Sequence, residues 1–93
     1  MKVKFADYDL ARVEREKSYT AGLAADVMKG FRKVMGAIRA ATDSRDLYNG
    51  GLQTEKLKGS RQHQHSVRIN KKWRLIIEIK EETVNVQGIE DYH

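Results

Sequence analysis

The sequence has no cysteine and no proline among its 93 residues. Disulfide bonds and thiol chemistry are therefore excluded, and the absence of cysteine fits a reducing compartment. No apolar run approaches the roughly 20 residues that a membrane-spanning helix needs. The opening segment 1–5 has no long apolar stretch after it, so we expect no signal peptide. These absences predict a cytoplasmic protein that does not enter a membrane.

Length and composition favour one small folded domain that covers residues 1–93. Hydrophobic residues make up 40% of the chain and charged residues 33%, values that suit a globular protein. A chain of this length buries only about 60–70% of its unfolded surface. Its core will be thin, and a second domain is not expected.

Charge is unevenly distributed along the chain, whose formal net charge is +5. Segment 56–74 contains two histidines and no acidic residue, and its seven basic residues are Lys56, Lys58, Arg61, Arg68, Lys71, Lys72 and Arg74. Acidic residues dominate the following segment 78–91. Clustered charge of one sign favours an anionic partner, with nucleic acid first.

The first half of the sequence predicts a strand followed by two helices. Residues 2–5 alternate in polarity, and Asp7 or Asp9 can cap the helix that we expect over 8–19. Segment 20–41 carries one apolar stripe at helical spacing, formed by Leu23, Val27, Phe31, Val34, Met35 and Ile38. We interpret that stripe as core, and we expect Gly36 to allow close packing against the first helix.

The second half changes to a period of two, which is typical of strands. Segments 64–70, 73–80 and 84–87 alternate in polarity, and turns are expected at 70–72 and 81–82. A meander of this kind needs a cover for its apolar face, which the long helix supplies. The fold class is therefore α+β: an N-terminal strand, two helices and a twisted antiparallel sheet.

The apolar parity of the last strand changes at Gly88. Val84 and Val86 are even-numbered, whereas Ile89 is odd-numbered. An extra residue in one strand produces such a change, so we predict a β-bulge at Gly88. With the bulge, Ile89, Asp91 and His93 share one face.

The sequence contains no metal-ligand spacing and no nucleotide-binding glycine loop. His63 and His65 are two residues apart, but no further ligand is evident, so no metal and no cofactor are expected. The basic residues of segment 56–74 suit an RNA backbone, and Arg68 and Arg74 are expected on one solvent-exposed face. The alternative is a basic hairpin that only protects a sheet edge.

Four segments together resemble the HigB branch of the RelE-like toxins. They are Leu57-Lys58-Gly59, segment 66–70, Trp73-Arg74-Leu75 and the closing segment 89–93, Ile-Glu-Asp-Tyr-His. Their order and spacing match from about Leu52 onward. The resemblance implies a RelE-like fold and a toxin of a type II toxin–antitoxin pair. Such toxins enter the ribosomal A site and cleave mRNA.

The resemblance also implies partners and site residues. The partners are the ribosome, mRNA and a HigA-like helix-turn-helix antitoxin, with operator DNA contacted only through that antitoxin. The motif match covers Lys58, Arg74, Asp91, Tyr92 and His93. Where several members of the family have His-Pro, this chain has Glu55-Lys56. A carboxylate can accept a proton in place of an imidazole.

RNA cleavage without a metal uses the 2′-hydroxyl of the substrate as nucleophile, assisted by a base, an acid and cations. Our hypothesis assigns Glu55 or Asp91 as base and His93 as acid. Arg74 and Lys58 hold the phosphate, and Tyr92 stacks on or orients a base. The carboxylate at the end of the chain favours the imidazolium form of His93. Lys56, Arg61, Arg68, Lys71 and Lys72 complete the candidate RNA-binding set.

Two other classes of function stay open at this point. One is a non-catalytic protein that binds RNA or an antitoxin. The other is a gyrase poison of the ParE kind.

Overall fold

The structure is a computed structural model that describes residues 1–91, so the predictions for Tyr92 and His93 lie outside the described residues. The elements are β1 (Lys2–Phe5), α1 (Tyr8–Arg15), α2 (Ala25–Ala40), α3 (Ser44–Asn49), β2 (Glu55–Lys56), the 3-10 turn η1 (Gly59–Arg61), β3 (His65–Arg68), β4 (Trp73–Lys80) and β5 (Thr83–Asp91).

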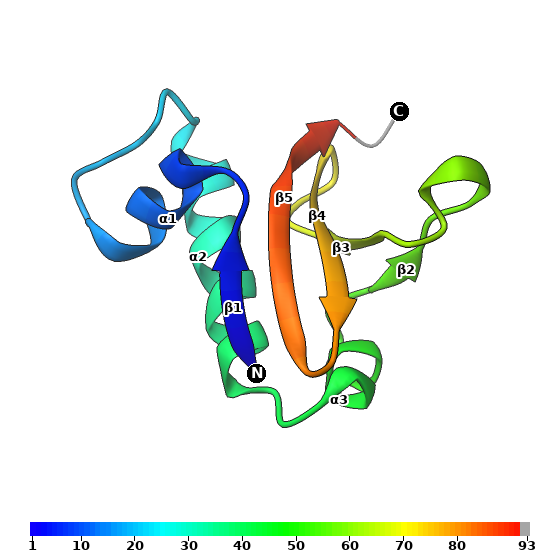
Figure 1. Cartoon of the computed structure of the whole chain (residues 1–93). Helices are drawn as coiled ribbons and strands as arrows, with labels where there is room; N and C mark the ends of the chain where they lie inside the picture. The colour runs from blue at the N-terminus through cyan, green and yellow to red at the C-terminus, as the bar shows by residue number, and fades with distance from the viewer. Residues whose placement is uncertain (92–93) are drawn as a thin grey trace.

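Residues 1–91 form one five-stranded sheet in the order β1-β5-β4-β3-β2 (Figure 1). The three predicted meander strands, β3, β4 and β5, pair antiparallel, as expected. The short strand β2, which the sequence did not predict, pairs antiparallel with β3, and β1 pairs parallel with β5. The α+β class is confirmed, while the purely antiparallel sheet is corrected to a mixed one. The parallel pairing is possible because β1 and β5 are far apart in the chain, so no tight hairpin connects them.

The core lies between α2 and one face of the sheet. The predicted helical stripe supplies buried Val27, Phe31, Val34, Met35 and Ile38. The strands supply the apolar partners Val67, Leu75, Ile77, Val84 and Val86. Each of these side chains is withdrawn from water, which stabilises the fold by roughly 1.5–3 kcal/mol per large residue. The prediction that the long helix covers the sheet is confirmed.

Both main helices are shorter than their patterns indicated. The side chain of Asp7 caps α1 by accepting the backbone N–H of Asp9 at 3.0 Å. Helix α2 begins at Ala25 because Ala21 and Gly22 have φ values of 50° and 75°, which a helix cannot contain. Segment 20–24 therefore forms a turn ahead of α2.

Gly30, and not Gly36, marks the close approach on α2. A Cβ at Gly30 would lie 2.7 Å from both the Cγ2 and the backbone oxygen of Ile69. A Cβ at Gly36 would meet nothing within 4 Å, so the prediction for Gly36 is wrong. Helix α2 therefore approaches the end of β3 closely at Gly30, a position where the helix has no side chain.

The predicted bulge in β5 is confirmed. Ile76 pairs with Gly88 and Ile77 pairs with Val86, which leaves Gln87 as the extra residue. The register change places Ile89 opposite Leu75 on the helix-covered face. Glu90 consequently pairs with Arg74 across the sheet, and its side chain belongs to the opposite face.

No helix within residues 1–91 has the length and apolar character needed to cross a bilayer.

Candidate active site

Arg74 is a buried arginine in the middle of the sheet. Strand β4 directs it to the face away from α2, and the residue is only 6% exposed. Its Nε donates to Ser66 Oγ at 2.7 Å, and its Nη2 donates to the Ser66 carbonyl at 3.2 Å and to the Gln53 carbonyl. A buried guanidinium is stable only where its donors are satisfied. These acceptors fix the plane of the guanidinium.

Glu55 faces Arg74 from β2. Its Oε2 lies 4.0 Å from Arg74 Nη2, and its side chain is 55% exposed. The register of the sheet explains why Glu55 and Arg74 lie close together. Glu55 pairs with Ser66, and Ser66 accepts a hydrogen bond from Arg74. A carboxylate that reaches solvent thus lies next to a guanidinium that does not.

A second arginine–carboxylate pair lies at the other end of the same cavity. Arg61 of η1 donates from both Nη atoms to Glu90 of β5, at 2.9 and 2.7 Å. Its Nε donates to Gln64 Oε1 at 2.8 Å. The hydrogen bond to Glu90 raises the pKa of Arg61 above its ordinary value. Both partners are substantially exposed, so the pair is screened by water.

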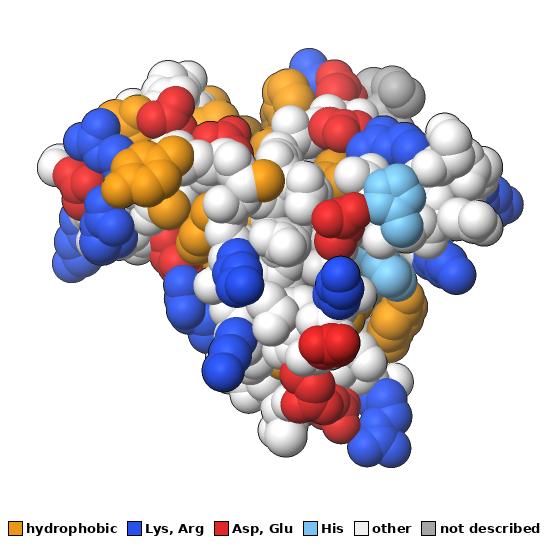
Figure 2. Space-filling view, in the orientation of Figure 1, with side chains coloured by type: hydrophobic (Ala, Val, Ile, Leu, Met, Phe, Trp, Pro, Cys, Tyr) orange, Lys and Arg blue, Asp and Glu red, His pale blue; other side chains and the backbone are white. Residues whose placement is uncertain are grey.

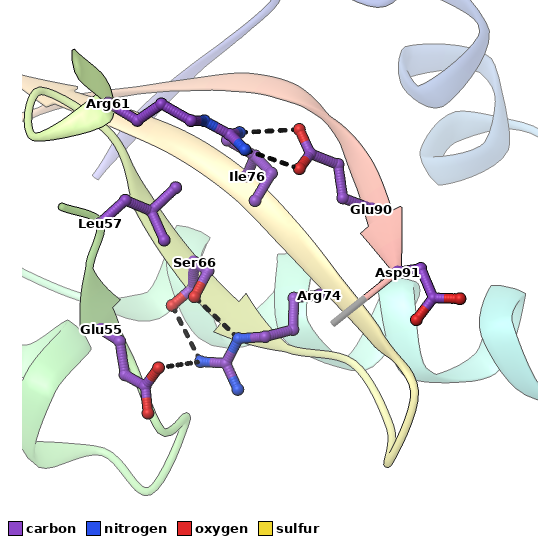
Figure 3. A pocket seen from close by; sticks show the side chains of 8 residues that line it. All are labelled: Glu55, Leu57, Arg61, Ser66, Arg74, Ile76, Glu90 and Asp91. Carbon is purple, nitrogen blue, oxygen red and sulfur yellow. Dashed lines mark hydrogen bonds and ion pairs between the residues drawn. The ribbon is translucent and has the colours of Figure 1, made fainter. Parts of the chain in front are cut away.

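Leu57 and Ile76 separate the two charged pairs and form an apolar floor (Figure 3). The cavity has a volume of about 270 Å³. Alternation along β4 places Ile76 on the same face as the polar residues Arg74 and Glu78, yet Ile76 is 3% exposed. Its burial follows from the segment around Leu57 and Arg61, which folds over that face of the sheet.

Asp91 also lines this cavity, from the end of β5. Its Oδ2 lies 3.7 Å from Lys72 Nζ, which connects the β3–β4 loop to the last strand. Lys72 also lies over the ring of Trp73, 5.4 Å from its centroid. The structure therefore brings Glu55, Arg74 and Asp91 to one cavity.

The remaining basic residues of the predicted set are dispersed. Lys56, Lys58 and Lys71 are exposed, and none of them lines the cavity. Arg68 lies in a separate groove with Lys33 of α2. Lys and Arg side chains are spread over the face seen in Figure 2, with acidic side chains between them. Arg68 and Arg74, the two arginines of the predicted set that pair across the sheet, thus line different cavities.

The expected shared solvent face of Arg68 and Arg74 is a further correction. The two residues pair across β3 and β4, as expected, but Arg74 is buried. Segment 52–55 lies beside Arg74 and supplies the Gln53 carbonyl, so the guanidinium is enclosed. Alternation predicted the correct side of the sheet, but it contains no information about what covers that side.

Sequence reasoning missed Ser66, Gln53 and Glu90. Ser66 is 2% exposed and holds Arg74, and Glu90 holds Arg61. The positions of Ser66 and Glu90 could have been predicted, because the alternation of the strands places both side chains on the same face of the sheet as Arg74. The role of Gln53 could not have been predicted, because this residue follows the glycine break at 50–51 and contacts Arg74 through its backbone oxygen.

The two histidines of the basic segment have separate surroundings. His63 Nε2 lies 3.3 Å from Glu78 Oε1, while the ring of His65 meets Tyr48 edge-on at a centroid distance of 5.8 Å. Burial, and then the nearby charge of Lys56, lowers the pKa of His65. Within residues 1–91, no three His, Asp or Glu side chains are close enough together to hold a metal ion.

The cavity combines groups that suit an anionic substrate. A fixed guanidinium can stabilise charge that develops on a phosphate oxygen. A carboxylate at its side can accept a proton. The apolar floor can hold a base or a sugar. This chemistry is compatible with cleavage of a phosphodiester.

Several solved structures have a similar fold. A YoeB–YefM complex from Staphylococcus aureus has a TM-score of 0.64 and 18% identity, and the match covers 100% of this chain and 97% of that one. A YoeB/ParE toxin from Agrobacterium tumefaciens has a TM-score of 0.60 and 16% identity, with both chains covered completely. YafQ from E. coli has a TM-score of 0.59 and 10% identity, with 98% and 92% covered. At these identities the likeness shows the fold.

A search of curated proteins finds no match to the sequence. The family described as "RelE-like toxin of type II toxin-antitoxin system HigB" matches residues 3–93. The four segments that resembled HigB all lie inside that match. This chain belongs to the HigB-like toxin family of type II toxin–antitoxin systems.

Proposed function

We propose that the chain is a ribosome-dependent endoribonuclease that cleaves translated mRNA. The observation that carries the proposal is the pair of Glu55 and buried Arg74 in one cavity, with 4.0 Å between Oε2 and Nη2. Plain RNA binding does not require a buried, oriented guanidinium beside a carboxylate. The family supports the toxin role, and the cavity supports the chemistry.

In the proposed reaction Glu55 takes the proton from the 2′-hydroxyl of the substrate. The 2′-oxygen attacks the adjacent phosphorus, and the bond to the 5′-oxygen breaks. His93 donates a proton to that leaving oxygen, and the products are a 2′,3′-cyclic phosphate and a free 5′-hydroxyl. General acid–base groups typically contribute ~10²–10⁴-fold each.

Arg74 stabilises the negative charge that develops on the phosphate oxygens. A positioned donor of this kind is worth about 10²–10³-fold in rate. Asp91 borders the same cavity and is the alternative base. We propose that Lys58 assists at the phosphate and that Tyr92 stacks on or orients a base of the mRNA.

The other proposed contacts to RNA come from Lys56, Arg61, Lys71 and Lys72. Lys56, Lys71 and Lys72 are exposed, so they can neutralise backbone phosphates without rearrangement of the core. Arg61 requires an exchange of partners, because Glu90 now accepts both of its Nη donors.

The proposed protein partner is a HigA-like helix-turn-helix antitoxin, through which the toxin contacts operator DNA. The similar YoeB of Staphylococcus aureus was solved as a complex with YefM. Membership of a toxin–antitoxin family supports an antitoxin for this chain as well.

Controlled expression in bacteria tests the proposal. We expect growth arrest, with new mRNA 5′ ends inside translated codons, and co-expression of the cognate antitoxin should restore growth. Arrest with DNA damage and intact mRNA would instead indicate gyrase as the target. Normal growth with stable protein would indicate a binding protein without catalysis.

The identity of the base is tested by comparing Glu55→Gln with Asp91→Asn. If Glu55 is the base, its replacement should lower kcat by about 10²–10⁴-fold and remove the acidic limb of the pH–rate profile. Asp91→Asn should keep that limb. The reverse result would assign the base to Asp91.

A further inference from the structure

Two arginines of the sheet are connected through one neutral residue. Arg68 and Arg74 pair across β3 and β4, so two like charges lie on one side of the sheet. Gln53 contacts both: its backbone oxygen accepts from Arg74, and its side-chain Oε1 accepts from Arg68 Nη1 at 3.1 Å. Two oxygens of one residue therefore hold two guanidinium groups at fixed positions.

The backbone of Gln53 is itself constrained. Its φ of 52° lies in the left-handed region, which is strained for a residue other than glycine and is kept only where the surroundings enforce it. The backbone N–H of Arg68 donates to the Leu52 carbonyl at 3.2 Å. The hydroxyl of Thr54 donates to the Leu47 carbonyl at 2.7 Å. Segment 52–54 is thus held before and after Gln53.

Arg68 is committed to this local structure. Its Nε donates to the Asn70 carbonyl at 3.3 Å, in addition to the contact with Gln53. It lines a groove between α2 and the end of β3, and it does not line the cavity of Arg74 and Glu55. These contacts give Arg68 a different surrounding from that of the exposed residue Lys71.

Ser66 holds Arg74 from the other side. The residue is 2% exposed, and both its hydroxyl and its carbonyl accept from the guanidinium. Because Ser66 also pairs with Glu55, the same strand position aligns the arginine and the carboxylate. Arg74 is therefore held between Ser66 and Gln53.

We propose that Ser66 and Arg68 are positioning residues for cleavage: Ser66 orients Arg74 directly, and Arg68 orients it through Gln53. This inference rests on the proposed nuclease function. It reassigns Arg68, which the sequence placed among the RNA-binding residues. Misplacement of a catalytic group by about 1 Å can cost about 100-fold in rate, so small shifts of Arg74 should be measurable.

Single-turnover and steady-state cleavage of mRNA on programmed ribosomes tests the proposal. Ser66→Ala and Arg68→Met should each lower kcat by roughly 10- to 100-fold and change KM by less than about twofold. Ser66→Thr keeps the hydroxyl and should recover most of the loss. Lys71→Met removes the same charge from the exposed loop, so it should raise KM and flatten the salt dependence with kcat unchanged.

A second measurement reports on the arginine without catalysis. The Nε–H signal of Arg74 in ¹⁵N NMR spectra should be protected from exchange in the wild type and in Lys71→Met. It should exchange faster in Ser66→Ala and Arg68→Met, while thermal unfolding shows that both variants remain folded.

The outcomes separate the inference from the proposed function. A wild type that cleaves no mRNA on the ribosome overturns the proposed function, and the inference with it. If the wild type cleaves, Arg68→Met with raised KM and unchanged kcat overturns the positioning role and makes Arg68 an RNA contact. Wild-type kcat in Ser66→Ala also overturns the inference.

Discussion

The two ends of the cavity contain the same pair of chemical groups in opposite environments. Arg74 is buried and held by a serine and a backbone carbonyl, whereas Arg61 is half-exposed and held by the carboxylate of Glu90. A buried guanidinium has little freedom, and its field is weakly screened. An exposed one can exchange its partner. The comparison supports our proposal that Arg74 acts in the chemical step and that Arg61 acts in RNA binding.

The largest effect is expected from Arg74→Lys. Lysine keeps the charge, but its single ammonium group cannot reproduce the planar set of hydrogen bonds that the guanidinium donates to Ser66 and to the Gln53 carbonyl. We expect kcat for mRNA cleavage to fall by about 10²–10³-fold. Arg61→Lys is the matched control, and its kcat should stay near wild type. Equal losses of kcat in both variants would remove the distinction between the two ends.

Gly30→Ala should disturb the end of the sheet that carries Arg74. The new methyl group meets the backbone oxygen of Ile69 at 2.7 Å, and backbone cannot move aside easily. We expect a loss of about 1–3 kcal/mol in the free energy of unfolding, measured by urea denaturation.

Gly36→Ala on the same helix is the control for that change. Its methyl group meets nothing within 4 Å, so the better helix propensity of alanine should raise stability by up to about 1 kcal/mol. If both variants shifted the free energy of unfolding in the same direction, the close contact between Gly30 and Ile69 would not be the reason that this position requires glycine.

A smaller effect is expected from Glu90→Gln at the exposed end. The change removes the charge that neutralises Arg61, so RNA should bind about two- to threefold more tightly, seen as a lower KM. Stability should change by less than about 1 kcal/mol, because the pair is exposed. A fall in kcat beyond tenfold would show that Glu90 belongs to the chemical step.

The smallest effect concerns His65, the neighbour of Ser66 on β3. Among the described residues its buried Nδ1 has no hydrogen-bond partner, in contrast to the satisfied donors of Arg74. Its lowered pKa means that the unfolded chain binds a proton more readily than the folded one. The free energy of unfolding should therefore rise with pH and should fall as pH drops through about 6.5.

The imidazole titration in NMR spectra and unfolding curves between about pH 5 and pH 7.5 check this prediction. His65→Gln should reduce the fall in stability on the acid side. His63→Gln should leave the titration midpoint of His65 in place. A midpoint for His65 above the ordinary range would contradict the prediction.

Much of the fold followed from local patterns. The apolar stripe of α2, the alternation of β3 to β5 and the parity change at Gly88 each needed only neighbouring residues. The positive φ values of 50° and 69° at Glu81 and Glu82 agree with the turn expected there. The start of α2 did not follow, because the turn at Ala21 and Gly22 breaks the helical pattern ahead of Ala25. The close contact at Gly30 did not follow either, because it depends on the packing of Ile69 against the helix.

The sequence by itself determined the class of fold, the family resemblance and the residues that are able to do acid–base and phosphate chemistry. These features depend only on residue type and on the periodicity of neighbouring residues. Only the tertiary structure decided which residues meet. It placed β1 parallel to β5, buried Arg74 beneath segment 52–55 and paired Arg61 with Glu90. These contacts join residues far apart in the chain, and no local pattern specifies them.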